Sequence, residues 1–411
     1  MTTPELFSNA PQTVTFTPTR RAGLARLTTF APRTGTHYAN QRNYDFGSGD
    51  RSAVSALSPW IKHRLITEEE VLTQTLDRHS LQGSIKFVQE VFWRGYFKGW
   101  MQQHPSVWHS YQAGVLRAQQ ALEQDMSRKA NYEDAIAGRA GIACFDHWCT
   151  ELKSSGYLHN HARMWFASIW IFTLRLPWEL GADFFLTHLV DGDAAANTLS
   201  WRWVGGLHTK GKTYLARPSN IAEFTNGRFD PTGQLSLDAV PLEEDLVHPA
   251  VPLVPMSPLP NVDYLLLITP EDCQPETFVA HPPMGVIGLR PADQAHQSVQ
   301  VSTFAQGALT DAISRSRDTA ADVMSIQDWS APLISAAQKA GVNQIVTAAA
   351  TIGPIADHLE AAKPALVRAG IHLHLHQRRY DALTWPHATK GFFKLKKKIP
   401  IILADLGLSS T

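Results

Sequence analysis

The stretch Leu189-Val-Asp191-Gly-Asp193-Ala-Ala-Ala-Asn197-Thr-Leu-Ser-Trp201-Arg-Trp203 brings two acids, an amide and two indoles into one short segment. Acids two positions apart around a glycine are typical of hydrogen-bond acceptors held by a tight turn. The amide and indoles that follow suit a flat ligand with polar edges and a π face. The same pattern also fits an Asx-capped turn that leads into a buried aromatic helix. Taken alone, the stretch leaves both interpretations open.

The composition sets the limits within which this stretch must be read. With 411 residues the chain is long enough for two or three domains, and its 37 basic and 37 acidic side chains create no overall cationic field. Any contact with nucleic acid must therefore use a local patch. Three cysteines supply neither a disulfide framework nor four cluster ligands. These features, and a start without a secretory signal, predict a reduced cytoplasmic protein without an iron-sulfur centre.

The periodicity of the chain divides it into four parts. Residues 1–37 are expected to form a polar arm and residues 38–240 an all-helical domain, in which Glu123 to Ala137 is a polar region. The most apolar run, Trp165 to Leu174, is too short to span a membrane, so no membrane contact is expected. Residues 241–261 are rich in proline and form a linker.

Residues 262–411 alternate short apolar runs with helical segments, which predicts a Rossmann-like domain with a parallel sheet covered on both faces. No Gly-x-Gly-x-x-Gly loop is found, so a dinucleotide is not expected there. The expected strands are Tyr264 to Ile268, Met284 to Leu289, Val323 to Ile326, Gln344 to Ala348 and Ile371 to Leu375.

Two features of this last part suggest ligands without requiring them. His372, His374 and His376 alternate along one strand, but no carboxylate or cysteine of ligand spacing lies near them, so no metal site is expected. The lysines from Lys394 to Lys398 are interpreted as a solvated terminal helix face, with a DNA site as the less favoured alternative.

Two further patterns in the helical part carry chemistry. A Gly/Ser loop, Gly47 to Arg51, feeds the helix start Ser55-Ala-Leu57-Ser58-Pro, which offers hydroxyls and free N–H groups of the kind that bind phosphate. Glu90 and Arg94 are four apart and share a helix face, with Trp93 beside them. The alternative for the first pattern is an ordinary helix cap. The alternative for the second is a solvated ion pair next to a core indole.

Taken together, the blocks of residues 38 to 230 are similar to the flavin-binding domain of the DNA photolyase/cryptochrome family. Five ordered blocks carry this resemblance: Tyr38-Ala-Asn-Gln-Arg42-Asn-Tyr44, Ser55-Ala-Leu57-Ser58-Pro59, Glu90-Val-Phe-Trp93-Arg94, His159-Asn160-His161-Ala-Arg163-Met164, and Asp191-Gly-Asp193 through Trp203. The resemblance implies a photolyase-type, all-helical FAD-binding domain followed by a Rossmann-like α/β domain.

The resemblance implies FAD as cofactor, bound folded within the helices. It places Tyr38, Ser55, Leu57 and Ser58 around the diphosphate, and Asn160, Arg163, Asp191 and Asp193 around the ring system and sugar. Asn197 would face flavin N5, where an amide oxygen can accept from N5–H. Trp201 and Trp178 fall on the two inner positions of the family's chain of indoles for photoreduction.

The family's reaction is the light-driven splitting of cyclobutane pyrimidine dimers in DNA by an electron from excited, reduced flavin. The resemblance makes Trp93 and Trp203 the walls that hold the flipped dimer, and Glu90 the acid at the pyrimidine carbonyl, with Asn160 and Met164 beside it. Arg42, Arg94 and His161 would contact the DNA.

Several departures qualify the resemblance. His161 replaces an Arg, Gly95 replaces an acid and Ala143 replaces a Pro. The third indole of the electron-transfer chain is also absent. Either Tyr132 or another aromatic residue takes its place, or reduction of the flavin by light is inefficient. The α/β part follows the flavin domain instead of preceding it, as in a circular permutation. No particular antenna chromophore follows from the sequence.

We therefore expect a photolyase-like enzyme that acts on damaged DNA. The alternatives are a cryptochrome-like photoreceptor without repair activity, whose partner would be a protein, and a light-independent nucleic-acid binder that kept the fold.

Overall fold

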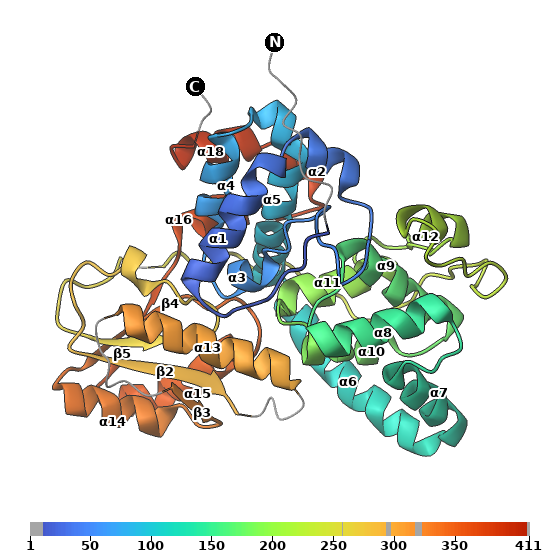
Figure 1. The fold of residues 1–411 in the computed structure, drawn as a ribbon. Helices are drawn as coiled ribbons and strands as arrows, with labels where there is room; N and C mark the ends of the chain where they lie inside the picture. Colours follow the sequence, from blue (N-terminus) through green and yellow to red (C-terminus); the bar gives the residue numbers. More distant parts are fainter. Residues whose placement is uncertain (1–10, 257, 293–296, 317–322, 409–411) are drawn as a thin grey trace, which may run out of the picture.

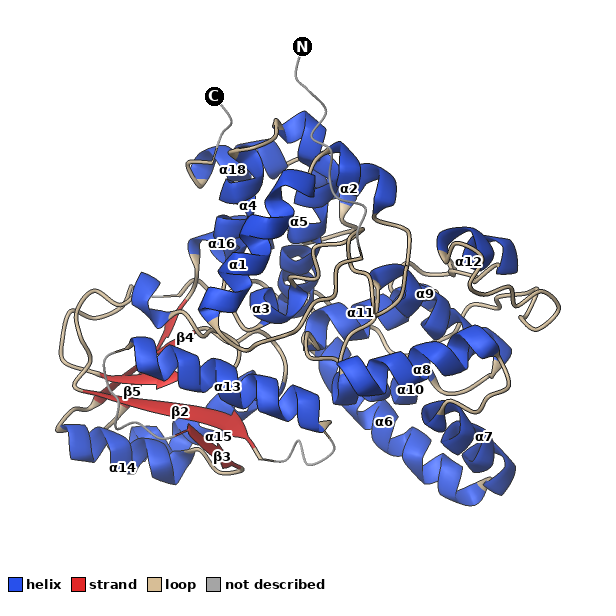
Figure 2. Cartoon of the chain, viewed as in Figure 1, coloured by secondary structure: helices blue, strands red, loops and turns tan. Residues whose placement is uncertain are grey.

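The computed structural model describes residues 11–256, 258–292, 297–316 and 323–408. A helical body and an α/β body lie side by side, and every strand of the described residues belongs to the second (Figures 1 and 2). The all-helical first part and the parallel α/β second part that the sequence predicts are confirmed.

The first group of helices forms the upper part of the helical body in Figure 1. Thr67 and Glu70 form a reciprocal capping box that starts α4, and Ser80 caps α5 through the N–H of Gly83. The helices are α1 (Arg20–Phe30), α2 (Thr36–Gln41), α3 (Ser58–Lys62), α4 (Glu68–Leu76) and α5 (Leu81–Gln103), with a short 3-10 turn, η1 (Ala31–Arg33).

Helix α1 differs from the polar arm expected for residues 1–37. Leu27 and Phe30 on α1 are fully buried, and both belong to the same core cluster as Leu57 and Trp60. The apolar positions within this Thr- and Arg-rich sequence are few, but they are spaced on one helix face. Residues 20–30 are therefore part of the helical core.

The second group of helices surrounds the stretch from Asp191 to Trp203. It comprises α6 (Ser106–Gln124), α7 (Met126–Ala137), α8 (Ala143–Ser155), α9 (Asn160–Ser168), the π-helical turn η2 (Ile169–Thr173), α10 (Trp178–His188), α11 (Ala194–Val204) and α12 (Pro218–Phe224). The polar region from Glu123 to Ala137 is largely helix α7, because Asp125 caps its start and Gly138 ends it in the left-handed conformation.

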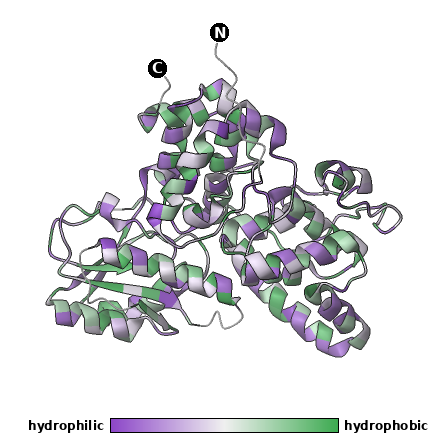
Figure 3. Cartoon of the chain, viewed as in Figure 1, coloured by the Kyte–Doolittle hydropathy of each residue, from purple (hydrophilic) through white to green (hydrophobic). Residues whose placement is uncertain are grey.

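The α/β body is built on a parallel sheet with the strand order β3-β2-β1-β4-β5. Its central strand β1 is buried along its whole length, and the hydropathy colouring shows apolar strands beneath partly polar helices (Figure 3). The strands are β1 (Leu265–Ile268), β2 (Gly285–Pro291), β3 (Val323–Ile326), β4 (Gln344–Ala348) and β5 (His372–His376); the helices are α13 (Val299–Arg315), α14 (Ser330–Ala340) and α15 (Pro354–Arg368), with the 3-10 turn η3 (Pro275–Thr277).

The end of the chain leaves the sheet and packs on the helical body. Tyr380 donates a hydrogen bond to the Val91 carbonyl of α5 at 3.2 Å, and the backbone of Trp385 lies against Gly99. The elements concerned are α16 (Arg379–Thr384), η4 (Trp385–His387), α17 (Phe393–Lys396) and α18 (Ile399–Asp405). Residues beyond 378 thus belong structurally to the helical body, although the sequence division assigns them to the α/β domain.

The segment between the two bodies has no regular secondary structure in its described residues, as its prolines predict. It is nevertheless fixed: Glu244 pairs with Arg202 of α11, and the Val251 N–H donates to the Gln103 carbonyl at 2.7 Å. Among the described residues, no helix combines the length and the apolar character that crossing a bilayer requires.

Candidate functional site

The loop from Asp191 to Asp193 holds two buried carboxylates in different ways. Arg163 of α9 donates from Nη2 to Asp191 Oδ2 at 2.9 Å, and from Nε to the Leu158 carbonyl at 3.0 Å. Asp191 is 5% exposed, and its other oxygen, Oδ1, has no partner within the described protein. A guanidinium with two bonds has a fixed plane, so the Asp191 carboxylate is held in a defined orientation with one oxygen available.

Asp193 caps helix α11 and also faces a buried lysine. Its Oδ1 accepts from the Ala196 N–H at 2.8 Å, and its Oδ2 lies 3.5 Å from Lys98 Nζ on α5. Burial alone would raise the pKa of Asp193, but the cations Lys98 and Arg94 and the N–H of Ala196 hold it below the ordinary value. Asp193 is therefore ionised at neutral pH.

One turn into α11, Asn197 has a fixed amide. Its Nδ2 donates to the Ala182 carbonyl at 2.8 Å, which leaves Oδ1 as a hydrogen-bond acceptor. No bond to this oxygen is found among the described residues. The bond to the Ala182 carbonyl fixes the amide plane, so Oδ1 is available in a defined position to accept from a ligand.

The loop before α3 is surrounded by cations. Arg26 of α1 donates to the carbonyls of Ser55 at 2.7 Å and Val54 at 2.9 Å, and Arg33 donates to the Ser52 carbonyl. Burial lowers the pKa of Arg26 to about 10, which still leaves it charged. Between Ser55 and Leu57, Ala56 has a φ of 50°, a left-handed conformation that non-glycine residues rarely adopt.

Tyr157, in the loop between α8 and α9, connects the loop before α3 with the Asp191 loop. Its ring lies 4.8 Å from the Arg51 guanidinium and 5.2 Å from that of Arg163. Tyr157 also interacts electrostatically with Arg26 and with Asp191. The two loops therefore meet around one buried ring.

Tyr38 lies in the same region and is 8% exposed. Its ring meets Phe87 of α5 edge-on at 5.0 Å, and burial raises the pKa of its hydroxyl, which interacts with Arg42 and Glu90. The residues expected around the diphosphate thus come from α2, from the loop before α3 and from the first residue of α3.

A chain of aromatic rings runs from α11 to the surface. Trp201 is 2% exposed and lies 6.2 Å from Trp170, which lies 6.0 Å from the half-buried Tyr132 on α7. Trp178 contacts Tyr111 at 5.8 Å. Tyr132 therefore contacts Trp170, which the sequence did not assign to the chain. Among the described residues, no ring contact joins Trp178 to Trp201 or to Tyr132.

Glu90 and Trp93 lie on the side of α5 that faces α2 and the end of the chain. Arg42 forms an ion pair with Glu90, whose pKa is raised by burial, although Arg42 opposes this rise. Trp93 is half-buried, and one of its faces stacks on Phe392 with ring centroids 3.9 Å apart at 12°. The other expected wall, Trp203, stacks on Tyr214 at 5.7 Å.

The two indoles belong to neighbouring helices that meet nearby. Tyr96, one turn after Trp93, is hydrogen-bonded through its hydroxyl to His208 Nε2 at 3.0 Å, five residues after Trp203. This bond joins the α5 segment that carries Trp93 to the loop that follows Trp203.

The remaining predicted site residues differ in how far their side chains are free to contact a ligand. Asn160 begins α9 and is exposed, and Met164 is half-buried. His161 lies within 3.0 Å of the Asn43 carbonyl through Nδ1 and 3.4 Å of the Tyr214 hydroxyl through Nε2, and it stacks on Trp165. Arg94 is half-buried, with Nε and Nη2 buried and without a partner in the described chain.

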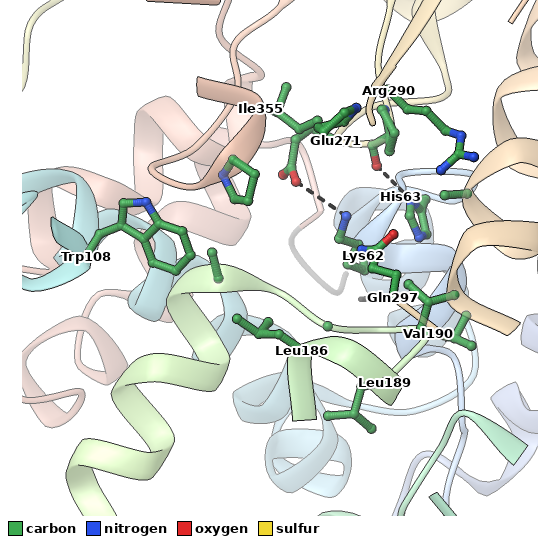
Figure 4. Close-up of a pocket in the computed structure, with 17 residues that line it drawn as sticks. Lys62, His63, Trp108, Leu186, Leu189, Val190, Glu271, Arg290, Gln297 and Ile355 are labelled. Atoms are coloured by element: carbon green, nitrogen blue, oxygen red, sulfur yellow. Dashed lines mark hydrogen bonds and ion pairs between the residues drawn. The ribbon is translucent and has the colours of Figure 1, made fainter. Parts of the chain in front are cut away.

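A separate cavity of about 680 Å³, including its open mouth, lies between the two bodies (Figure 4). Lys62 pairs there with Glu271 at 3.4 Å, and His63 Nδ1 lies 2.7 Å from the Pro270 carbonyl. Gly192 borders this cavity, whereas Asp191 and Asp193 are not among its described lining residues. The cavity is therefore distinct from the cluster around Tyr157.

Residues 87–251 match the family model described as the FAD-binding domain of DNA photolyase. These residues therefore form an FAD-binding domain of the DNA photolyase type. The match begins inside α5 and ends in the linker, so it includes the Asp191 loop and α9 to α11 of this FAD-binding domain.

Curated relatives of the FAD-binding domain are named deoxyribodipyrimidine photo-lyase. The Escherichia coli K12 protein is 28% identical over 257 residues, covering 59% of this chain and 51% of its own length. A Thermus thermophilus protein is 30% identical over 223 residues, covering 53% and 49%. This chain therefore spans about half the length of the curated relatives it matches.

Among solved structures, a bacterial class III photolyase from Agrobacterium tumefaciens superimposes with a TM-score of 0.43 at 22% identity, covering 55% of this chain and 50% of that one. This score is too low to support any argument about the site.

The residues of the FAD-binding domain fit its cofactor. The half-buried Arg26 lies against the loop where a diphosphate is expected, and its acceptors among the described residues are backbone carbonyls and Gln12. Asp191 Oδ1 and Asn197 Oδ1 are acceptors that the described protein leaves free. Phosphate charge and the polar edge of a flavin would satisfy both kinds of group. When bound, FAD supplies the redox chemistry that the side chains themselves lack.

Sequence reasoning missed Lys98, Tyr157, Arg26 and Phe392. Lys98 follows Arg94 by four residues, so helix spacing could have placed it on the same face. Tyr157 lies directly before the His159 block, and proximity could have included it. Arg26 and Phe392 come from opposite ends of the chain and could be found only from the tertiary structure.

Proposed function

We propose that this protein is an FAD-dependent photolyase that splits cyclobutane pyrimidine dimers in DNA under blue or near-ultraviolet light. The homologues' names support the reaction class, and the arrangement of α5 and α11 supports the repair activity.

The observation that carries the proposal is the placement of Trp93 and Trp203. The Tyr96–His208 bond joins the α5 segment that carries Trp93 to the loop that follows Trp203, which supports the assignment of both indoles to one site. Two aromatic walls suit a flipped pair of stacked pyrimidines, because each stacking contact contributes about 1 to 3 kcal/mol.

Polar side chains near these walls have the chemistry that a pyrimidine dimer needs. In the proposal, Glu90 donates to a pyrimidine carbonyl when it is protonated and accepts from a pyrimidine N3–H when it is ionised. The exposed Asn160 donates to a second carbonyl, with Met164 beside it. In the proposal, Tyr38, Ser55, Leu57 and Ser58 hold the diphosphate, Arg163, Asp191 and Asp193 hold the ring system and sugar, and Asn197 accepts from flavin N5–H.

Trp201 and Trp178 are proposed to carry electrons during photoreduction. Arg42 is proposed to contact the DNA at the rim. For Arg94 and His161 the same role requires a rearrangement, because Arg94 directs buried nitrogens inward and both ring nitrogens of His161 have partners within the protein.

The test is binding and repair of a dimer-containing oligonucleotide by Trp93→Ala and Trp203→Ala. Each variant should weaken dimer binding by about 1 to 3 kcal/mol and leave the FAD content unchanged. Phe229→Ala removes a half-buried aromatic ring that packs on Trp148; it is the matched control and should bind like the wild type. Equal binding by all four proteins would refute the assignment.

A cryptochrome-like photoreceptor is the second candidate, because Phe392 already covers one face of Trp93. A light-dependent change in oligomeric state or partner binding that survives Trp93→Ala, together with absence of repair, would favour it.

A further inference from the structure

The end of the chain carries a concentrated positive charge. Residues 386–401 contain five lysines and no acid. Lys390, Lys394, Lys397 and Lys398 are exposed, and Lys396 is half-buried. None of them forms an ion pair with a carboxylate among the described residues; the Lys394 ammonium donates to the Thr389 hydroxyl at 2.9 Å.

This segment is fixed to the helical body by apolar side chains. Phe392 is 4% exposed and stacks on Trp93, while Leu395 and Ile399 are fully buried. A packed residue at every third or fourth position leaves the intervening lysines on the outer side. The charges are therefore presented on an ordered surface and not on a free tail.

The positive charges of neighbouring lysines act together at this surface. The pKa of His387 is lowered by partial burial and then by Lys398 and Lys394, so the imidazole lies in their field and stays neutral at pH 7. Phe393 is 73% exposed, and Lys396 Nζ lies 5.8 Å from its ring centre. An exposed ring among unpaired cations is a surface that a nucleic acid can cover.

We propose that Lys390, Lys394, Lys396, Lys397 and Lys398 bind the phosphate backbone of DNA next to the flipped dimer. This inference rests on the proposed function, because it takes Trp93 as a wall of the dimer site. Phe392 contacts Trp93 directly, so the lysines two to six residues away lie close to that wall. Phosphates on either side of a flipped nucleotide would pass over such a surface.

The geometry favours DNA over an anionic membrane. A lipid surface would explain the lysines and Phe393 but not their attachment to the indole of the proposed dimer site.

The experiment measures the salt dependence of binding to a duplex with one thymine dimer, in the dark, by fluorescence anisotropy. The test variant is Lys394→Gln/Lys397→Gln/Lys398→Gln. The control is Lys129→Gln/Lys339→Gln/Lys363→Gln, which removes three cations from α7, α14 and α15. Circular dichroism and FAD content verify that both variants fold.

Each lysine that neutralises a phosphate contributes about 0.9 to the slope of log K against log salt, so the test variant should lower that slope by about 2 to 3. The control should keep the wild-type slope. Repair per bound complex at saturating DNA should be unchanged in the test variant, because these lysines do not touch the dimer.

A wild type that binds and repairs dimers, with the same slope in the test variant, would overturn this inference and leave the proposed function intact. A wild type that neither binds nor repairs dimer-containing DNA would refute the proposed function and the inference with it. Loss of binding to phosphatidylserine vesicles in the test variant, with an unchanged DNA slope, would assign the surface to a membrane and overturn the inference.

Discussion

Gly181→Ala tests the position of Trp201 directly. A Cβ at residue 181 would lie 2.3 Å from Trp201 Cη2 and 2.9 Å from Trp170 Nε1, well inside van der Waals contact. Trp201 is 2% exposed and enclosed by Phe185 and Trp170, so its ring cannot move aside freely. Overpacking of this kind costs about 1 to 3 kcal/mol. The free energy of unfolding from a urea titration should fall by that amount.

The displaced indole should also slow light-driven reduction of the bound FAD, measured by flavin absorbance under blue light with an external reductant. Gly391→Ala is the matched control, because nothing lies within 4 Å of its new Cβ and residue 391 lies in no segment proposed to hold FAD. It should change neither quantity. A Gly181→Ala protein with wild-type stability and photoreduction would refute both the packing and the role of Trp201.

Three further variants test other parts of the site. Asp191→Asn should reduce FAD content in the purified protein, because it weakens the pair with Arg163 and removes a carboxylate acceptor; a wild-type flavin-to-protein absorbance ratio would contradict this. Lys98→Met should destabilise the fold by about 3 to 5 kcal/mol, because it leaves Asp193 buried without its ammonium partner; an unchanged denaturation midpoint would contradict this. Burial lowers the pKa of His159 to about 4, below its ordinary 6.5, so its contribution to stability is present above pH 6.5 and is lost as the pH falls toward 4. His159→Gln should therefore flatten the fall in melting temperature over that range, and an identical pH profile would refute the assignment.

The sequence predicted the α/β part well because its elements are strongly periodic. Strands β3 and β4 have the predicted bounds, and β1, β2 and β5 differ by one or two residues at their ends. Apolar runs separated by helices leave few alternatives to a parallel sheet. The sequence could not show that residues beyond 378 pack on α5, because that contact depends on tertiary burial of side chains such as Tyr380 and Trp385.

The candidate site was predictable where its residues lie in short blocks. Arg163 and Asp191 come from two such blocks, and the structure joins them at 2.9 Å. Tyr132 was expected as a possible end of the electron-transfer chain, but the structure places it against Trp170. Phe392 lies about 300 residues from Trp93, and only the fold brings the two rings together.

The most direct test of the central claim is light-dependent repair by the FAD-loaded, chemically reduced protein. A dimer-containing oligonucleotide is irradiated with blue light, and restored thymines are counted by chromatography against a dark sample. The account predicts catalytic restoration in the light and none in the dark. Full FAD loading and dimer binding without any restored thymine would contradict it.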